Sequence, residues 1–115
     1  MSLRSLNDKI KLIAEILTSI DGLAAYHYYV PDNVTAPYCI WAEDGEGTSH
    51  HSDNHGREQV VTGRIDYYTR TEFDDVVDEI QDALDAEDDI HWSLYGVAYE
   101  PETGLVHYTW DWEAS

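Results

Sequence analysis

Apolar residues recur every three or four positions near the start of the chain, which is the spacing of one face of an α-helix. The pattern predicts a helix from about Leu6 to Ile20. Ser5, followed by Asp8 three residues later, has the spacing of a capping box, and Gly22 stands where helices commonly end. The apolar face of this predicted helix consists of Leu3, Leu6, Ile10, Ile13, Leu17 and Ile20.

A second segment with the helical period lies in the second half of the chain. It predicts a helix from about Glu72 to Ala86, with Thr71 as a favourable N-cap residue. Its apolar face consists of Phe73, Val76, Val77, Ile80, Ala83 and Leu84.

Three segments between the two helices are typical of β-strands, being rich in Tyr and Val or apolar on both faces. They run from about Ala24 to Val30, from Pro37 to Trp41 and from Glu58 to Tyr68. Residues 31–33, Pro-Asp-Asn, supply turn chemistry between the first two. Gly63 in the middle of the third indicates a bulge or a close backbone approach.

The last part of the chain predicts a β-hairpin. Its strands run from about Ile90 to Tyr99 and from Leu105 to Trp112, and Gly104 in the connecting turn is able to adopt a left-handed conformation. Apolar and polar residues alternate most regularly in the final strand, which indicates a strand with one buried face.

The predicted order of elements is α-β-β-β-α-β-β. Because the links between strands are short, we expect a largely antiparallel sheet, with the two helices packed on one of its faces in an α+β fold. A chain of 115 residues has room for one core, so residues 1–115 form a single predicted domain.

Acidic residues outnumber basic ones 24 to 6, which gives a formal net charge of −18. This charge would repel phosphates and therefore excludes the usual electrostatic route to tight binding of DNA, RNA or an anionic membrane. No apolar run approaches the length of about 20 residues that crosses a bilayer. The first residues lack the apolar stretch of a signal peptide, so we expect no secretion by that route.

Acidic residues concentrate on and around the second predicted helix. Three interpretations remain open for this surface: a solvated face, a face that repels DNA, or a face that meets a basic partner. No calcium-loop pattern of the EF-hand type is present. The predicted acidic surface consists of Asp74, Asp75, Asp78, Glu79, Asp82 and Asp85.

The segment from Asp44 to Gly56 is rich in Gly, Ser, His and Asp and predicts one long loop. It contains the residue types that bind transition metals, although a metal site needs ligands held rigidly and a solvated loop is the simpler interpretation. The weak metal candidates are His50, His51, Asp53 and His55.

Motifs that would indicate catalysis are missing. Cys39, the single cysteine, lies in an apolar strand without nearby positive charge, which favours a buried structural thiol over a nucleophile. The sequence contains no Gly-rich phosphate loop, no G-x-S-x-G and no H-E-x-x-H pattern. We therefore expect neither enzymatic activity nor a cofactor.

Nine Tyr and four Trp stand against a single Phe. Rings with a polar tip suit protein interfaces, and a small core cannot hide all of them. We therefore expect some at a contact between subunits; the predicted interface residues are Tyr28, Trp41, Tyr67, Tyr95 and Tyr99.

Three segments together resemble a known group of virion proteins. They are the strand Pro37–Trp41, the strand 60–70 with the sequence VVTGRIDYYTR, and the helix Phe73–Leu84, which follow an amphipathic helix and precede an aromatic hairpin. This order resembles the tail-terminator, tail-completion and head–tail joining proteins of long-tailed bacteriophages and prophages.

The resemblance implies a structural role. It implies a ring of identical subunits, often a hexamer, at the tail or the head–tail junction, with other phage tail or connector proteins as neighbours. DNA would pass through an acidic channel without being tightly bound, because negative walls offer phosphates no binding partner. The protein would lie in the virion and, during assembly, in the host cytoplasm.

Two other functions remain open from the sequence. The chain could be an acidic DNA mimic that presents carboxylates to a basic host protein, which its size and charge would suit. It could also be a small metal-dependent protein that uses the loop from His50 to His55.

Overall fold

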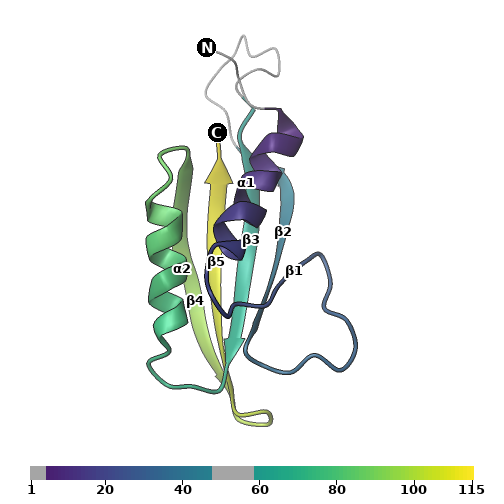
Figure 1. The fold of residues 1–115 in the computed structure, drawn as a ribbon, viewed down its shortest axis with the longest axis vertical. Helices are drawn as coiled ribbons and strands as arrows, with labels where there is room; N and C mark the ends of the chain where they lie inside the picture. Colours follow the sequence, from purple (N-terminus) through teal and green to yellow (C-terminus); the bar gives the residue numbers. More distant parts are fainter. Residues whose placement is uncertain (1–4, 48–58) are drawn as a thin grey trace.

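The computed structural model describes residues 5–47 and 59–115. Its elements form a five-stranded sheet with strand order β1-β2-β3-β5-β4 and two helices, which confirms the predicted α-β-β-β-α-β-β order and the α+β class (Figure 1). The elements are α1 (Leu6–Thr18), β1 (Ala25–His27), β2 (Tyr38–Glu46), β3 (Val61–Thr69), α2 (Asp75–Asp85), β4 (Ile90–Glu100) and β5 (Leu105–Ala114).

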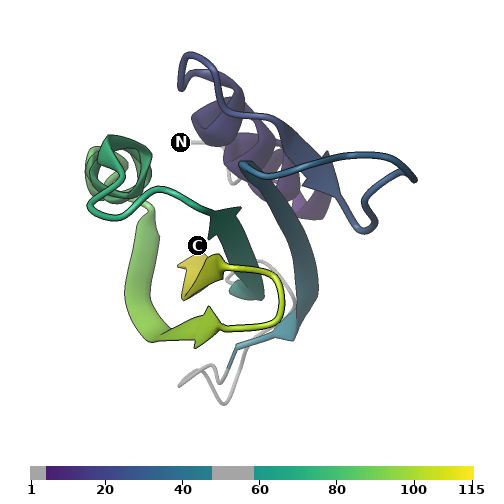
Figure 2. The same cartoon turned by 90° about the horizontal axis from the view of Figure 1, so that it is seen from below.

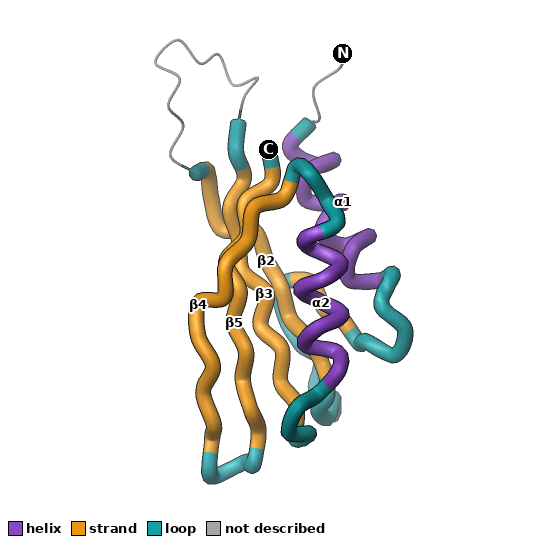
Figure 3. The backbone as a smooth tube through the Cα atoms, turned by 90° about the vertical axis from the view of Figure 1, so that its left-hand side faces the viewer, coloured by secondary structure: helices purple, strands orange, loops and turns teal. Residues whose placement is uncertain are grey.

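Both helices lie on the same face of the sheet (Figures 2 and 3). Helix α2 packs near β4, whereas α1 packs near β1 and β3, so each helix covers one side of that face. We call this the helix face and the opposite one the open face. The buried core lies between the helix face and the helices, and its largest fully buried side chains are Trp110, Trp112 and Tyr67.

Helix α1 begins as the sequence predicts. The Ser5 hydroxyl accepts a hydrogen bond from the backbone N–H of Asp8, and the Asp8 carboxylate accepts one from the N–H of Ser5, which completes the capping box. The helix ends at Thr18, two residues earlier than expected, and Gly22 follows with a φ of 78°. Such a left-handed residue is commonly glycine because it has no Cβ.

Helix α2 begins later than the sequence predicts. Its N-cap is Asp74 instead of Thr71, and Asp74 accepts a hydrogen bond from the N–H of Val76. Phe73, expected on the apolar face of this helix, precedes it with a φ of 56° and is 86% exposed. The reason is that Tyr67 and Thr69 of β3 donate hydrogen bonds to the Asp74 carboxylate and fix the cap beside the sheet.

The first two strands pair in parallel, within the largely antiparallel sheet that the sequence predicts. Ala25 pairs with Cys39 and His27 with Trp41 in the same direction. The chain leaves β1 through Tyr28, at a φ of 77°, and returns to the beginning of β2 beside the beginning of β1. The remaining three strand pairs are antiparallel, as expected.

Strand β2 continues to Glu46 and so includes the first residues of the predicted loop. Hydrogen bonds hold the described residues on either side of 48–58: the N–H of Gly47 donates to the carbonyl of Val60 at 2.7 Å. The ammonium of Lys9, which is buried, donates to the carbonyl of Gln59.

Gly63 is the site of a close approach, one of the two alternatives predicted for it. A Cβ placed on this residue would lie 2.3 Å from Cζ2 of Trp112 and 2.4 Å from the carbonyl oxygen of Ala42. Glycine is therefore required here by packing, because a Cβ would overlap the Trp112 ring of β5 and the backbone of β2.

Candidate functional site

Strand β4 forms one edge of the sheet. It pairs with β5 on one side, and no strand of the described ranges pairs with its other side. Its side chains Leu94, Tyr95, Val97 and Tyr99 are 47%, 64%, 52% and 63% exposed. From Ile90 to Tyr99 it contains no Lys, Arg, Asp, Glu or Pro, the residues that commonly protect an edge from pairing. We call these four side chains and the free side of β4 the β4 edge.

Three of these side chains point to the helix face. Leu94 is paired with Trp110, Val97 with Tyr108 and Tyr99 with Val106, and these partners belong to the core-facing set of β5. A bulge between Leu94 and Gly96 shifts the register. The β4 edge therefore extends the apolar helix face beyond the part that α2 covers.

Tyr95, inside that bulge, contacts the open face instead. The guanidinium of Arg64 lies 4.1 Å from the centre of its ring, within the range of a cation–π contact. The same guanidinium donates to the Asp111 carboxylate at 2.8 Å. The side chains of Arg64 and Asp111 are 47% and 43% exposed, so we expect this ion pair to contribute little to the free energy of unfolding.

The predicted acidic surface is located on α2. Asp75, Asp78, Glu79, Asp82 and Asp85 all lie in this helix and are exposed. Asp74 differs from them because it is the half-buried N-cap with three hydrogen-bond donors. Burial works against ionisation of Asp74, but the bonds from Thr69, Tyr67 and the Val76 N–H outweigh it and lower the pKa of the carboxyl.

The five predicted interface aromatics separate into two groups. Tyr28, Tyr95 and Tyr99 are exposed and available to a partner. Trp41 and Tyr67 are buried within the single chain, so neither offers an exposed ring to a partner. Tyr67 lies in the core, whereas Trp41 also lines a pocket between α1 and β1.

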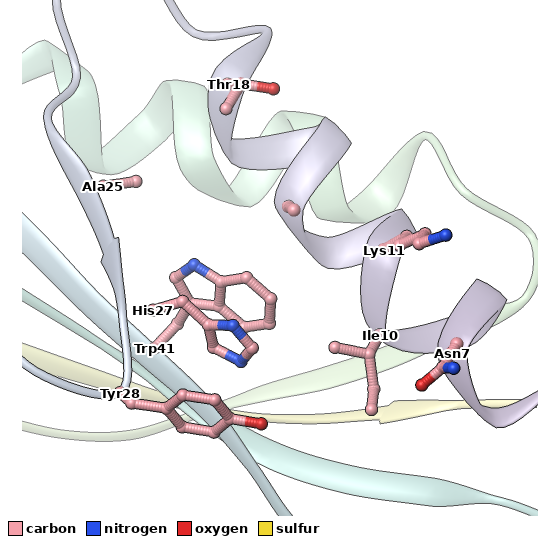
Figure 4. A pocket seen from close by; sticks show the side chains of 9 residues that line it. Asn7, Ile10, Lys11, Thr18, Ala25, His27, Tyr28 and Trp41 are labelled. Carbon is pink, nitrogen blue, oxygen red and sulfur yellow. The ribbon is translucent and has the colours of Figure 1, made fainter.

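A pocket of about 380 Å³ opens between α1 and β1, at the edge of the sheet opposite β4 (Figure 4). Its floor is a stack of rings in which His27 lies 3.7 Å from Tyr28 and 3.9 Å from Trp41. We call it the α1–β1 pocket; its walls are formed by Asn7, Ile10, Lys11, Ala14, Thr18 and Ala25.

Glu43 fixes the polar ends of that stack. Its carboxylate lies 2.8 Å from Nε2 of His27 and accepts a hydrogen bond from the hydroxyl of Tyr28. This hydrogen bond, with the negative charge of Glu43, raises the pKa of the exposed Tyr28 phenol. The pocket is therefore preformed and mainly apolar, which suits an apolar or aromatic group better than a charged one.

The open face carries a row of aromatic rings and one small polar cluster. Tyr68 stacks on Tyr38 at 5.1 Å and on His107 at 4.1 Å. Nε2 of His107 and the hydroxyl of Thr109 lie 2.7 and 2.8 Å from the same oxygen of Asp66. In a catalytic triad the two imidazole nitrogens contact different groups. Here one nitrogen faces both the carboxylate and the hydroxyl, so no proton relay is formed.

Cys39 is fully buried, as predicted. Burial raises the pKa of its thiol to about 12, with a smaller contribution from the charge of Asp66. A thiol of this kind is protonated at neutral pH and is a poor nucleophile.

The proposed metal ligands His50, His51, Asp53 and His55 lie outside the described residues. Among the residues that are described, no group of three or more His, Cys, Asp or Glu side chains could hold a metal ion. In the same ranges, none of the helices combines the length and the apolar content needed to cross a bilayer.

The sequence reasoning did not identify Leu94, Val97 or the α1–β1 pocket. A signal for the first two is present, because residues 92–99 contain no Asp, Glu, Lys or Arg although they occur in a very acidic chain. The pocket had no comparable signal, since it depends on the parallel β1–β2 pair. A scan against protein-family models finds no match to this chain, and a search of curated proteins finds no similar sequence.

Proposed function

We propose that this protein is a non-enzymatic structural subunit of a long-tailed phage or prophage virion, of the tail-terminator or head–tail joining type, which associates with copies of itself through the β4 edge. The observation that carries the proposal is that edge: its strand is eleven residues long, is unpaired on one side among the described strands and presents four exposed apolar or aromatic side chains. Such edges promote pairing with another chain.

Two further features support a structural role. The α-β-β-β-α-β-β order, on which the resemblance to tail-terminator proteins rests, is the order of the fold. In the polar cluster of the open face, the same Nε2 of His107 faces both the Asp66 carboxylate and the Thr109 hydroxyl, which is not the arrangement of a catalytic triad. In an assembled ring, the acidic surface of α2 would give DNA no binding partner.

Native mass spectrometry and size-exclusion chromatography with light scattering test the proposal directly. We expect wild-type protein to form a closed oligomer at high concentration and Val97→Lys to remain monomeric. The lysine places a charge on the exposed β4 edge, a common device against edge pairing. Glu102→Lys, in the exposed β4–β5 turn, is the matched control and should associate like the wild type. A wild-type chain that stays monomeric throughout would contradict the proposal.

A second candidate function is supported by the exposed carboxylates of α2, which could mimic the phosphates of DNA for a basic partner. Ionic strength separates the two functions. Added salt weakens binding to a basic protein but reduces the repulsion between copies of a chain with a net charge of −18. Capture of a basic protein that is released by salt, without any self-association, would favour the mimic. Genes for capsid, connector and tail-tube proteins next to this one would support the virion role.

A further inference from the structure

We propose that the α1–β1 pocket receives the apolar side chains of the β4 edge of a second copy, so that subunits associate head to tail. The inference rests on the proposed self-association and specifies its geometry. The alternative geometry is a symmetric dimer in which two β4 edges pair with each other. The head-to-tail and symmetric geometries can be distinguished by three features: the directions of the edge strands, the positions of their side chains and the charges of the helices.

The strand directions allow head-to-tail continuation of the sheet. β1 is parallel to β2, and the direction then reverses at β3, at β5 and at β4. β4 therefore runs opposite to β1 within one subunit. When two copies are placed side by side in the same orientation, β4 of the first lies antiparallel to β1 of the second, which is the more favourable pairing.

The apolar groups of the two edges lie on the same side of such a continued sheet. Leu94, Val97 and Tyr99 of the β4 edge point to the helix face. The α1–β1 pocket also opens on the helix face, because it lies between α1 and the ring of Trp41 (Figure 4). The exposed side chains of one copy would therefore meet the preformed apolar pocket of the next.

The charges of the helices oppose the symmetric alternative. Pairing two β4 edges about a two-fold axis places the two copies of α2 next to each other, and each presents five exposed carboxylates and no basic residue. Head-to-tail pairing places α2 next to α1 of the neighbour instead. The exposed charges of α1 are those of Asp8, Lys11 and Glu15, a net of −1, so the repulsion is much weaker.

Two unlike surfaces can be tested by mixing two defective variants. Val97→Lys blocks the β4 edge but leaves the pocket intact. Ala14→Trp fills the pocket from α1 but leaves the edge intact. We expect each variant alone to be monomeric in native mass spectrometry at concentrations where the wild type associates. We expect their equimolar mixture to form a one-to-one heterodimer, because each supplies the surface that the other lacks.

A second pocket variant is needed in case Ala14→Trp fails to fold. Lys11→Glu changes an exposed residue at the pocket wall and should weaken association about tenfold or more, while far-UV circular dichroism stays unchanged. Self-association of Ala14→Trp alone would overturn the head-to-tail inference in favour of symmetric β4 pairing, and would leave the proposed function intact. A mixture that remains monomeric would also overturn it. A monomeric wild type would instead refute the proposed function, and this inference with it.

Discussion

Asp74 joins the end of β3 to the start of α2, and its replacement by alanine should show how strongly the fold depends on that junction. Alanine removes the N-cap bond to Val76, which is typically worth about 1 kcal/mol. It also leaves the buried hydroxyl of Tyr67 without its acceptor at a cost of about 1–3 kcal/mol, and Thr69 loses the same acceptor. We expect a loss of about 3–5 kcal/mol in the free energy of unfolding.

Urea denaturation followed by tryptophan fluorescence measures this loss, because Trp110 and Trp112 are fully buried in the folded chain. A double-mutant cycle with Tyr67→Phe makes the test specific. Removing the Tyr67 hydroxyl should cost about 1 kcal/mol in the wild type but should recover about 1–3 kcal/mol in Asp74→Ala, because it removes the buried hydroxyl that has lost its acceptor. Additive effects of the two substitutions would refute the reasoning, as would a loss below about 1 kcal/mol for Asp74→Ala.

The same junction should respond to acid. Because the pKa of Asp74 is lower in the folded chain than in the unfolded chain, its stabilisation is fully present above its unfolded pKa. It is lost as the pH falls through the folded pKa. The difference in unfolding free energy between wild type and Asp74→Ala should therefore shrink when the urea titration is moved from neutral pH to about pH 3. A difference that stays constant with pH would show that the ionised carboxylate is not the stabilising group.

Three further predictions concern other parts of the molecule. Gly63→Ala should destabilise the chain by about 1–3 kcal/mol or more in urea titrations, because its Cβ would overlap Trp112 and the carbonyl of Ala42. Cys39 should react with a thiol reagent only after unfolding in urea, since its pKa is raised to about 12 and it is fully buried; rapid labelling of the native chain would contradict this. Self-association should strengthen when salt is raised from about 0.05 to 0.5 M, which sedimentation equilibrium can measure.

The order of helices and strands could be predicted from local sequence patterns. The observed structure differs from the prediction where contacts between separate elements set the bounds of a helix or the direction of a strand. The capping box of α1 depends on neighbouring residues and was predictable. The start of α2 was misplaced because Thr71 is a good cap in isolation, whereas the acceptor for Tyr67 and Thr69 is Asp74. These two donors lie in β3, and the helical spacing of apolar residues gives no information about contacts between a helix and a strand.

The candidate site was less predictable than the fold. The aromatic excess predicted interface rings, but composition alone does not separate exposed Tyr95 and Tyr99 from buried Trp41 and Tyr67. Strand order decides this, because it makes β4 an edge and places β3 in the middle of the sheet. The α1–β1 pocket exists only because β1 runs parallel to β2, which the short link between them did not indicate.

The contacts at Gly47, Val60, Lys9 and Gln59 have a practical consequence for segment 48–58. Since the chain is hydrogen-bonded at Gly47 and again at Gln59 and Val60, a change of length between them should leave the ends of β2 and β3 in place. An epitope or a small reporter domain inserted there should leave the melting temperature almost unchanged.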